Sequence, residues 1–522
     1  MYKIVLSLLV LICASCSKEE NQRDSRQVTL NLSGPIQSYD CRQVNDIPSF
    51  ILMKMLYEGL TRLEKGDQVV PALAQTIEQE GLRYIFTLKD SQWSNGEKVT
   101  AYDFEYSWKS QLDPQFPSPV AQAFYPIKNA REVKRGDLPQ TELGIKAINE
   151  KQLEVELSYN APHFLYLTAL PPFFPVYKEM SSEENWGEKA MSVVCNGPFS
   201  IYDVQNHNKI SLQKNPWYHE KKEVKLDFID LLMLDGTNEL ELFENGDLDW
   251  AGSPLGTLPT DAIDSLQKKG EIKLSPSLAT SYLFFQTEKK PLDNKKFRQA
   301  LSVAIEREKI CEHLLKNLQK PAYGFLPPSI QINAPQHFQK KIAAKQVFEE
   351  ALAEMGIKKE ELEPITLNYT LDERTHKIAQ ALQEQWNEAF GINVTLNKME
   401  RKTFFSKRAA GEYQICISNW FGDYPDPMNF LEIFEDADSS SNHSFWEDSV
   451  YQDLLLLAKE EQDPLKRRSL LGQAEEILIE EAPIAPIFHF NMAYLKNKNL
   501  KNTFISSLGH LDFRNAYISE EE

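Results

Sequence analysis

Residues 378–396 read IAQALQEQWNEAFGINVTL, and this stretch contains both a helix pattern and a strand pattern. The apolar residues Ile378, Leu382, Trp386 and Phe390 recur every four positions, which is typical of the buried face of an amphipathic helix. Gly391 follows directly, as expected at a helix C-terminus, and INVTL then alternates apolar and polar side chains as a strand does. A helix, a glycine and a strand within about 20 residues are typical of an α/β layer, so the sequence predicts an α/β fold.

Patterns elsewhere in the chain agree with this class. Strand-like alternation is present in residues 82–88 and 153–157. Helical periodicity runs from Phe297 to Leu315, and again over residues 347–355 before a glycine. Asn95-Gly96 predicts a turn, and Thr100 with Asp103 predicts the cap of a helix that follows it. The remaining sequence has no fixed-period repeat.

The N-terminus has the pattern of a bacterial lipoprotein signal. Lys3 precedes the short apolar run of residues 4–12, and Ala14-Ser15 places two small residues before Cys16. The run is too short to span a bilayer core, which needs about 20 apolar residues. We therefore expect residues 1–15 to be a cleaved signal peptide and Cys16 to be the lipidation site. The mature protein is then exported and tethered to a membrane.

Size and charge limit the class of protein further. The chain has 522 residues, which predicts two to four domains, and 42% of them are hydrophobic, which is enough for large cores. The formal net charge is −19, so long-range electrostatics favour cationic partners and oppose polyanions. No nucleic-acid partner is expected.

Export permits disulfides, but the cysteines are far apart and none forms a CxxC pair outside the signal. Cys311 lies on the apolar face of an expected helix, and Cys416 lies in an apolar strand-like run. These two are expected to be buried free thiols. The state of Cys41 and Cys195 is left open by the sequence.

The search for catalytic and metal-binding motifs is negative. The sequence has no GxSxG, P-loop, HExxH or GxGxxG motif, and its nine histidines are scattered. The acidic stretch from Asp235 to Asp249 lacks the ligand spacing of a calcium loop. We therefore expect no enzyme activity, no cofactor and no metal.

An ordered set of local motifs resembles one family. Its strongest part is the segment Tyr84–Asp90 followed by Trp93–Phe104, and the other matches are YEGL at 57–60, PALA at 71–74, NGPF at 196–199, NPWY at 215–218, NGDLD at 245–249, DNKKFRQAL at 293–301 and WFGDYPDP at 420–427. Together they resemble the bacterial extracellular solute-binding lipoproteins, family 5, which feed oligopeptide and dipeptide ABC importers. The resemblance covers nearly the whole mature chain. Most of these motifs consist of turn and core residue types, so they identify the family rather than the site.

The resemblance implies a two-lobed periplasmic-binding-protein fold with a hinge and an interlobe cleft, built from three discontinuous domains. On this basis residues 16–46 contain the anchor, a linker and the start of lobe I, and residues 181–276 and 488–522 complete that lobe. Residues 47–180 form an additional domain packed beside lobe I, and residues 277–487 form lobe II. Two crossover strands are expected to hinge the lobes, and ligand is expected to close them together.

The same resemblance places the binding site in the WFGDYPDP segment. Ile415 to Ile417 reads as a buried strand, and Asp423 follows where the chain leaves it, a common position for ligand-binding residues in α/β domains. In similar proteins the matching aspartate pairs with the free α-ammonium of a bound peptide. Trp420 and Tyr424 are the neighbouring aromatic candidates for peptide contacts.

This chain departs from the family's sequence pattern at two positions near the tryptophan. Some similar oligopeptide binders have a basic residue three positions before the tryptophan, where it holds the peptide carboxylate, but this chain has Ile417 there. Arg408 is the remaining candidate for a carboxylate contact. Those relatives also have a cysteine after the tryptophan, whereas this chain has Phe421, so their disulfide is not expected.

The expected function is the capture of oligopeptides between two lobes, followed by delivery to an ABC transporter permease in the inner membrane. Backbone hydrogen bonds and hydrated pockets would give broad side-chain tolerance. The protein is expected on the periplasmic side of the cell envelope, as a lipid-anchored monomer. Two alternatives stay open: an exported peptide hydrolase, and a structural or host-facing surface lipoprotein that has lost ligand binding.

Overall fold

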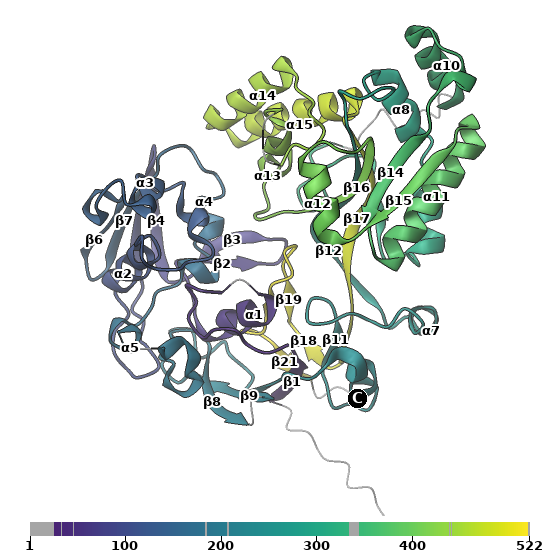
Figure 1. Cartoon of the computed structure of the whole chain (residues 1–522). Coiled ribbons are helices and arrows are strands. Elements are labelled where there is room, and N and C mark those ends of the chain that lie inside the picture. The colour runs from purple at the N-terminus through teal and green to yellow at the C-terminus, as the bar shows by residue number, and fades with distance from the viewer. Residues whose placement is uncertain are drawn as a thin grey trace, which may run out of the picture.

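The structure is a computed structural model, which describes residues 26–32, 34–44, 46–182, 185–205, 208–333, 344–437, 439 and 441–519. Helices and strands are both present and alternate along the chain, which confirms the predicted α/β class (Figure 1). The expected lipidation site Cys16 lies outside the described residues. Within them, no helix is long and apolar enough to cross a membrane.

One large core collects buried side chains from Val28 to Leu255 and from Leu500 to Ala516, and we call it the N-terminal core. It contains α1 (Ile47–Leu56) and α2 (Ala101–Gln111) and is built on two four-stranded sheets. The first has the order β1 (Gln27–Asn31), β10 (Phe228–Leu232), β9 (Lys209–Lys214), β8 (Phe199–Gln205), and the second has the order β4 (Ala74–Glu80), β5 (Arg83–Leu88), β7 (Gln152–Glu156), β6 (Ile145–Asn149). Because β1 pairs in parallel with β10, segments about 200 residues apart share one sheet.

A seven-stranded sheet forms the second body of the fold. Its order is β11 (Trp250–Gly252), β17 (Ile484–Lys496), β12 (Lys273–Phe285), β16 (Ile415–Phe421), β14 (Ile365–Thr370), β15 (Val394–Met399), with β13 (Lys320–Pro321) paired to β17. Side chains alternate between its two faces. Leu283 packs in one core with α8 (Lys295–Val303), α10 (Ala344–Met355) and α11 (Glu373–Phe390), and Tyr282 packs in the opposite core with α14 (Ser449–Glu460) and α15 (Pro464–Glu481).

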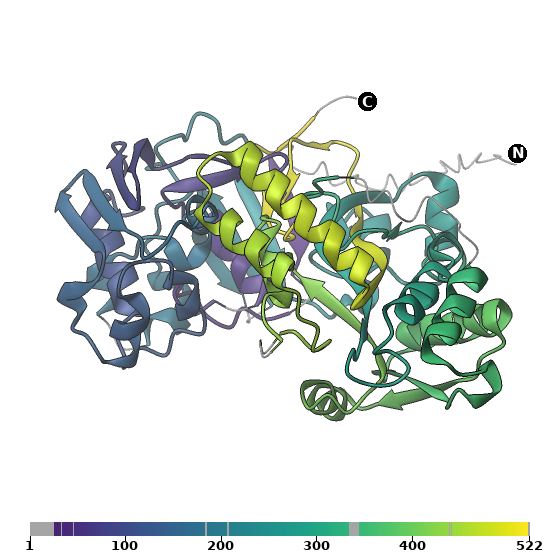
Figure 2. The same ribbon diagram turned by 90° about the horizontal axis from the view of Figure 1, so that it is seen from above.

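Seen from above, the yellow-green helices α14 and α15 lie between the blue segment of the N-terminal core and the green helices of the sheet (Figure 2). The other elements are short. They are β2 (Thr61–Glu64), β3 (Gln68–Pro71), α3 (Ala130–Arg135), α4 (Phe164–Leu167), α5 (Lys178–Ser181), α6 (Glu239–Glu244), α7 (Ile263–Lys269), α9 (Arg307–Lys309), α12 (Arg401–Ala409), α13 (Met428–Leu431), β18 (Leu500–Lys501), β19 (Phe504–Ile505), β20 (Leu511–Asp512) and β21 (Tyr517–Ile518).

The two longest strands, β12 and β17, lie side by side in the sheet. Their pairing changes register between Pro276 and Thr280, which locally bends an antiparallel pair. At this bend the Leu278 N–H donates to the Ser507 carbonyl, and the Leu278 carbonyl accepts from the Gly422 N–H, both at 2.8 Å. One residue thus links the C-terminal return segment to the loop that follows β16.

The segment with which the sequence analysis opened folds as predicted. Helix α11 begins after Asp372, whose side chain accepts from the Thr375 N–H, and it ends at Gly391 with φ +66°. Trp386 is fully buried, and its indole N–H donates to the Leu301 carbonyl at 2.9 Å. Strand β15 follows directly. Local pattern and tertiary packing agree here.

The predicted helix from Phe297 to Leu315 is wrong in its length. Helix α8 ends at Val303, and a five-residue π-helix covers Ile310–Leu314. The fully buried Arg307 explains the break, because its guanidinium donates to the carbonyls of Ser302 and Ile305, which a continuous helix would have used itself. The apolar positions of the pattern are nevertheless buried.

The predicted turn and cap near residue 100 are confirmed. Gly96 has φ +90°, and the Asp103 carboxylate accepts from the Thr100 N–H at 2.7 Å before α2. All four described cysteines are free and buried, which confirms the prediction for Cys311 and Cys416.

A half-buried charge network joins three distant segments of the N-terminal core. Arg62 contacts Glu58 at 3.1 Å and Glu220 at 2.6 Å, and Arg514 contacts Glu220 at 3.4 Å. Burial alone would raise the pKa of Glu58, but His219 and the two arginines lower it to about 2. The network therefore holds the return segment near residue 514 against strand β2.

Candidate functional site

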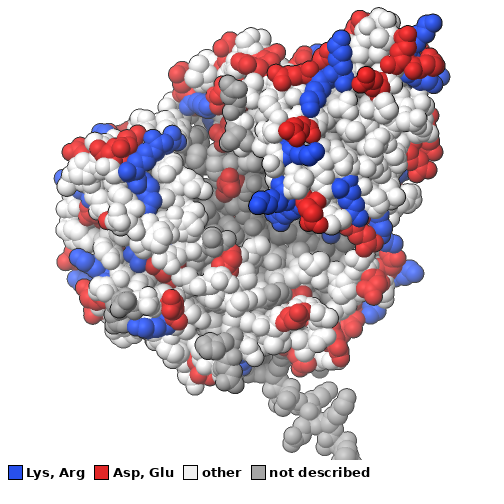
Figure 3. Space-filling view, viewed as in Figure 1, with Lys and Arg blue, Asp and Glu red and all other residues white. Residues whose placement is uncertain are grey.

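A cavity of about 610 Å³ lies where the N-terminal core meets the helices of the seven-stranded sheet. The space-filling view shows the molecule hollowed between these two parts (Figure 3). Segments that are far apart in the sequence line it, namely parts of 44–51, 120–126, 159–172, 422–432 and 508–510, together with Lys459 and Arg467. Its volume is within the range typical of small-molecule sites, about 300–1,000 Å³.

Asp423 lies in this cavity, and the local structure fixes its position. Strand β16 ends at Phe421, and the Gly422 N–H is held by the carbonyl of Leu278. The Asp423 N–H donates to Asn429 Oδ1 at 3.0 Å. The indole N–H of Trp420 donates to the same oxygen at 3.4 Å. Asn429 thus organises the loop, a role that no sequence motif indicates.

The Asp423 carboxylate has no cationic partner within the described residues, and burial raises its pKa. The two cations that line the cavity are already engaged. Lys459 contacts both oxygens of Glu435 at 2.5 and 2.6 Å, and Arg467 forms a two-bonded pair with Asp426 at 2.7 and 2.9 Å. A cation entering the cavity would therefore relieve an unpaired carboxylate.

Tyr424 also lines the cavity, where its ring stacks on His163. The ring centroids are 3.8 Å apart with an interplanar angle of 14°. The tyrosine hydroxyl donates to Glu432 Oε1 at 3.1 Å. Burial raises the pKa of Glu432 and lowers that of His163 to about 4, in the latter case despite the nearby Asp426. This stack connects the segment 159–172 to the loop that carries Asp423.

The lowered pKa of His163 predicts a pH effect on stability. Neutral His163 is favoured in the folded state, so its contribution is present above its ordinary pKa of 6.5 and is lost as pH falls through about 4. His163→Phe keeps a stacking ring that does not titrate. The melting temperature of this variant should fall less between pH 7 and 4 than that of the wild type. Parallel curves for the two proteins would contradict this assignment.

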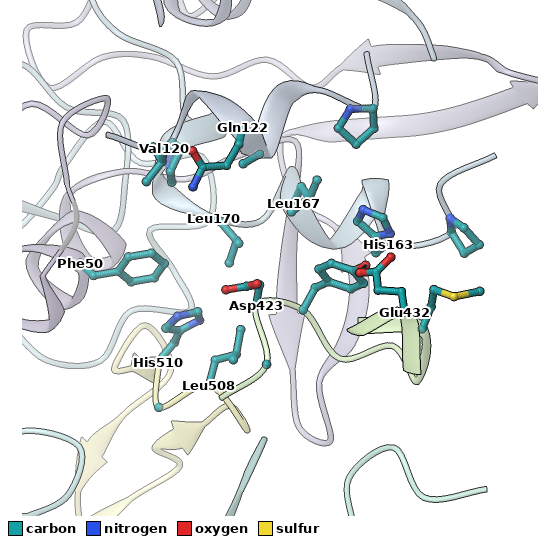
Figure 4. A pocket seen from close by; sticks show the side chains of 18 of the residues that line it. Phe50, Val120, Gln122, His163, Leu167, Leu170, Asp423, Glu432, Leu508 and His510 are labelled. Atoms are coloured by element: carbon teal, nitrogen blue, oxygen red, sulfur yellow. Dashed lines mark hydrogen bonds between the residues drawn. The ribbon is translucent and has the colours of Figure 1, made fainter. Parts of the chain in front are cut away.

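On the other side of Asp423, the cavity wall is apolar (Figure 4). Phe50 of α1 stacks on His510 with ring centroids 4.2 Å apart, and Leu170 and Leu508 lie close to the carboxylate. Burial, with a smaller contribution from Lys54, lowers the pKa of His510 to about 3. This ring is therefore neutral near pH 7.

The structure does not bring all four predicted peptide-binding residues to this cavity. Asp423 and Tyr424 line it, whereas Trp420 and Arg408 are not among its lining residues. Arg408 of α12 donates to Ser418 Oγ at 2.7 Å and lies over the ring of Phe405, with its guanidinium carbon 4.8 Å from the ring centroid. Ser418 and Trp420 are two positions apart on β16, so these side chains face the same side of the sheet. A ligand contact by Trp420 or Arg408 remains a prediction.

Metal binding is not indicated by the His, Cys, Asp and Glu side chains that the structure describes. In the part of the chain that the structure describes, no group of three or more His, Cys, Asp or Glu side chains could hold a metal ion. What the cavity offers is a carboxylate without a cationic partner among the described residues, apolar walls and engaged cations. These features suit a binding site for a ligand with a cationic group, in a cavity between two α/β bodies.

Comparison with known proteins identifies the family. Residues 68–442 match the family model described as "Bacterial extracellular solute-binding proteins, family 5 Middle", and the chain belongs to this family. It is 36% identical to the oligopeptide-binding protein OppA of Bacillus subtilis (strain 168) over 539 aligned positions, which cover 99% of both chains. The predicted family is thereby confirmed.

Two solved structures show the fold. The unliganded open form of the periplasmic murein tripeptide-binding protein MppA has a TM-score of 0.86 at 27% identity, with 94% of this chain and 97% of that chain covered. Haemophilus influenzae OppA in complex with RPPGFSPFR has a TM-score of 0.69 at 26% identity, with 94% and 99% covered. The predicted two-lobed fold is confirmed, and this structure is more similar to the open form than to the peptide complex.

Proposed function

We propose that this protein captures oligopeptides outside the cytoplasm and delivers them to the permease of an ABC importer. The observation that carries the proposal is the Asp423 carboxylate, which lies in a cavity between two bodies of the fold and has no cationic partner among the described residues. A peptide α-ammonium supplies the missing counter-charge. Family membership and the similarity to the oligopeptide-binding OppA of Bacillus subtilis support a peptide as the ligand.

Closure of the two bodies would complete the site. The higher TM-score with an open, unliganded relative supports an open state here, and peptide binding would favour the closed one. The expected lobe boundaries at 276/277 and 487/488 fall within β12 and β17, which makes this strand pair the hinge in our proposal. Residues 20–46, 181–276 and 488–522 would move as lobe I with residues 47–180, and residues 277–487 as lobe II.

The rest of the peptide would leave the cavity along β16. Its backbone can form strand-like hydrogen bonds, which carry no side-chain information and permit many sequences. Trp420 and Arg408 would meet the ligand on this path, the former as an apolar surface and the latter as a partner for the carboxylate. For Arg408 this requires its guanidinium to exchange the Ser418 hydroxyl for the peptide.

The protein would act as a monomer on the periplasmic side of the envelope, held by acyl chains on Cys16. A tether keeps it near the permease at high effective concentration. Several acyl chains matter because one chain anchors only weakly. The linker after Cys16 is polar, so the anchor and the binding site are expected to be independent.

Cys16→Ser should abolish lipidation and release the protein into the soluble fraction while peptide affinity stays unchanged. Membrane fractionation, intact-mass analysis and calorimetry on both proteins measure these three properties. A wild-type protein that is soluble and has a free Cys16 thiol would refute the anchor.

Native mass spectrometry of freshly purified protein distinguishes the proposal from its two rivals. Co-purified peptides, or complexes with added tripeptide of unchanged mass, support a binding protein without hydrolysis. Shortening of added peptides would instead indicate a hydrolase. No bound species, together with no peptide-induced change in melting temperature, would indicate a structural lipoprotein.

A further inference from the structure

The cavity extends past Asp423 into a chamber with apolar walls. We define the chamber by Phe50, Val120, Leu170, Leu508 and His510, which all line the cavity. In Figure 4 the Asp423 carboxylate lies between Leu170 and Leu508, with the stacked rings of Phe50 and His510 beside it and Val120 beyond. The chamber thus begins directly beside the charged group.

Among the described charged side chains around this chamber, those without an ion-pair partner are acidic. Asp46, Asp423 and Glu432 line the cavity as carboxyl groups, and Asp46 Oδ2 is buried without a hydrogen-bond partner. The cations Lys459 and Arg467 are held by Glu435 and Asp426. The imidazole of His510 is neutral near pH 7 and contributes a flat surface rather than a charge. Neither of the two cations among the described lining residues is free to pair with an anionic side chain.

The chamber walls are built independently of Asp423. Phe50 belongs to α1, whose N-terminus Asp46 caps through the Ser49 N–H at 2.9 Å, and Leu170 packs on the N-terminal core. Leu508 lies in a tight turn closed by the Gly509 N–H and the Ser506 carbonyl at 2.9 Å. Asp423 comes from the opposite body of the fold. The chamber is therefore formed before any closure, as a preorganised pocket should be.

We propose that this chamber receives the side chain of the ligand's first residue, so that peptides with a large apolar first residue are preferred and those with an acidic one are rejected. The inference rests on the proposed function, because it takes the α-ammonium to be bound by Asp423. The ammonium and the first side chain are attached to the same Cα atom. A peptide held at Asp423 therefore places that side chain within a few covalent bonds of the carboxylate, next to the chamber.

Calorimetry with Phe-Ala-Ala, Gly-Ala-Ala and Glu-Ala-Ala tests the preference on the wild-type chain. Burying a phenyl ring in an apolar pocket should make Phe-Ala-Ala bind about 10- to 100-fold more tightly than Gly-Ala-Ala. Glu-Ala-Ala should bind more weakly than Gly-Ala-Ala, because its carboxylate enters beside unpaired carboxyl groups. Equal affinities for the three peptides would overturn the chamber and leave peptide binding intact. No binding by any of them would overturn the proposed function as well.

Filling the chamber gives a residue-level test. Leu170→Trp should reduce the ratio of the Phe-Ala-Ala and Gly-Ala-Ala affinities at least tenfold, because the indole takes the volume that the phenyl ring would fill. The matched control is Leu465→Trp on α15, at a side chain that is 79% exposed, and it should keep the wild-type ratio. Val120→Trp fills the far side of the chamber and is the second variant if Leu170→Trp does not fold. A wild-type ratio in a folded filled variant would overturn the assignment.

Discussion

Asp423→Asn is expected to weaken the binding of a free tripeptide several hundredfold or more. In the closed state the peptide ammonium loses its water, and Asp423 is a carboxylate of the cavity that has no cationic partner among the described residues. Removing one partner of a buried ion pair costs about 3–5 kcal/mol, because the other charge stays buried and uncompensated. The amide of asparagine retains the shape of the side chain but not its charge.

Calorimetry with one tripeptide on the wild type and the variant measures this loss. Asp448→Asn is the matched control, since Asp448 caps α14 through the Tyr451 N–H and asparagine caps helices equally well. Its affinity should equal that of the wild type. A loss of less than about fivefold in Asp423→Asn would show that the ammonium is bound elsewhere.

Trp386→Ala is expected to lower the free energy of unfolding by about 3–5 kcal/mol, the cost typical of removing a buried tryptophan. The side chain is fully buried between α11 and the sheet, and its indole N–H is bound to Leu301 of α8. The substitution leaves a cavity and an unpaired carbonyl in a core that positions the sheet carrying β16.

Urea unfolding followed by circular dichroism measures the effect. Trp217→Ala is the matched control, because Trp217 is 42% exposed, and it should cost less than about 1 kcal/mol. Equal losses in the two variants would contradict the assignment of Trp386 to the core.

Local patterns predicted most of the regular structure because burial follows the helix and strand periods. Helix α11, Gly391 and strand β15 appear where residues 378–396 indicated them. The error at residues 304–315 has a different origin. There the tertiary contacts of one buried arginine, Arg307, override the periodicity, and its partner Pro486 is about 180 residues away.

The sequence could predict only the part of the candidate site that lies within a single motif. Asp423 and Tyr424 are in a recognisable motif, and both line the cavity. Its remaining walls come from segments separated by hundreds of residues, so no spacing in the sequence indicates that Phe50 and His510 stack. The direction of a side chain is equally hidden, and Arg408 of the predicted set lies over Phe405 and against Ser418.

The most direct test of the account compares a tripeptide and its N-acetylated twin on the wild type and on Asp423→Asn by calorimetry. Acetylation removes the ammonium, and the substitution removes its carboxylate partner. The four affinities therefore isolate the interaction between the ammonium and the Asp423 carboxylate. We predict tight binding only for the free peptide with the wild type, and three weak pairings of similar strength. Near-equal affinities across all four pairings would remove Asp423 from the site and contradict recognition of the peptide amino terminus.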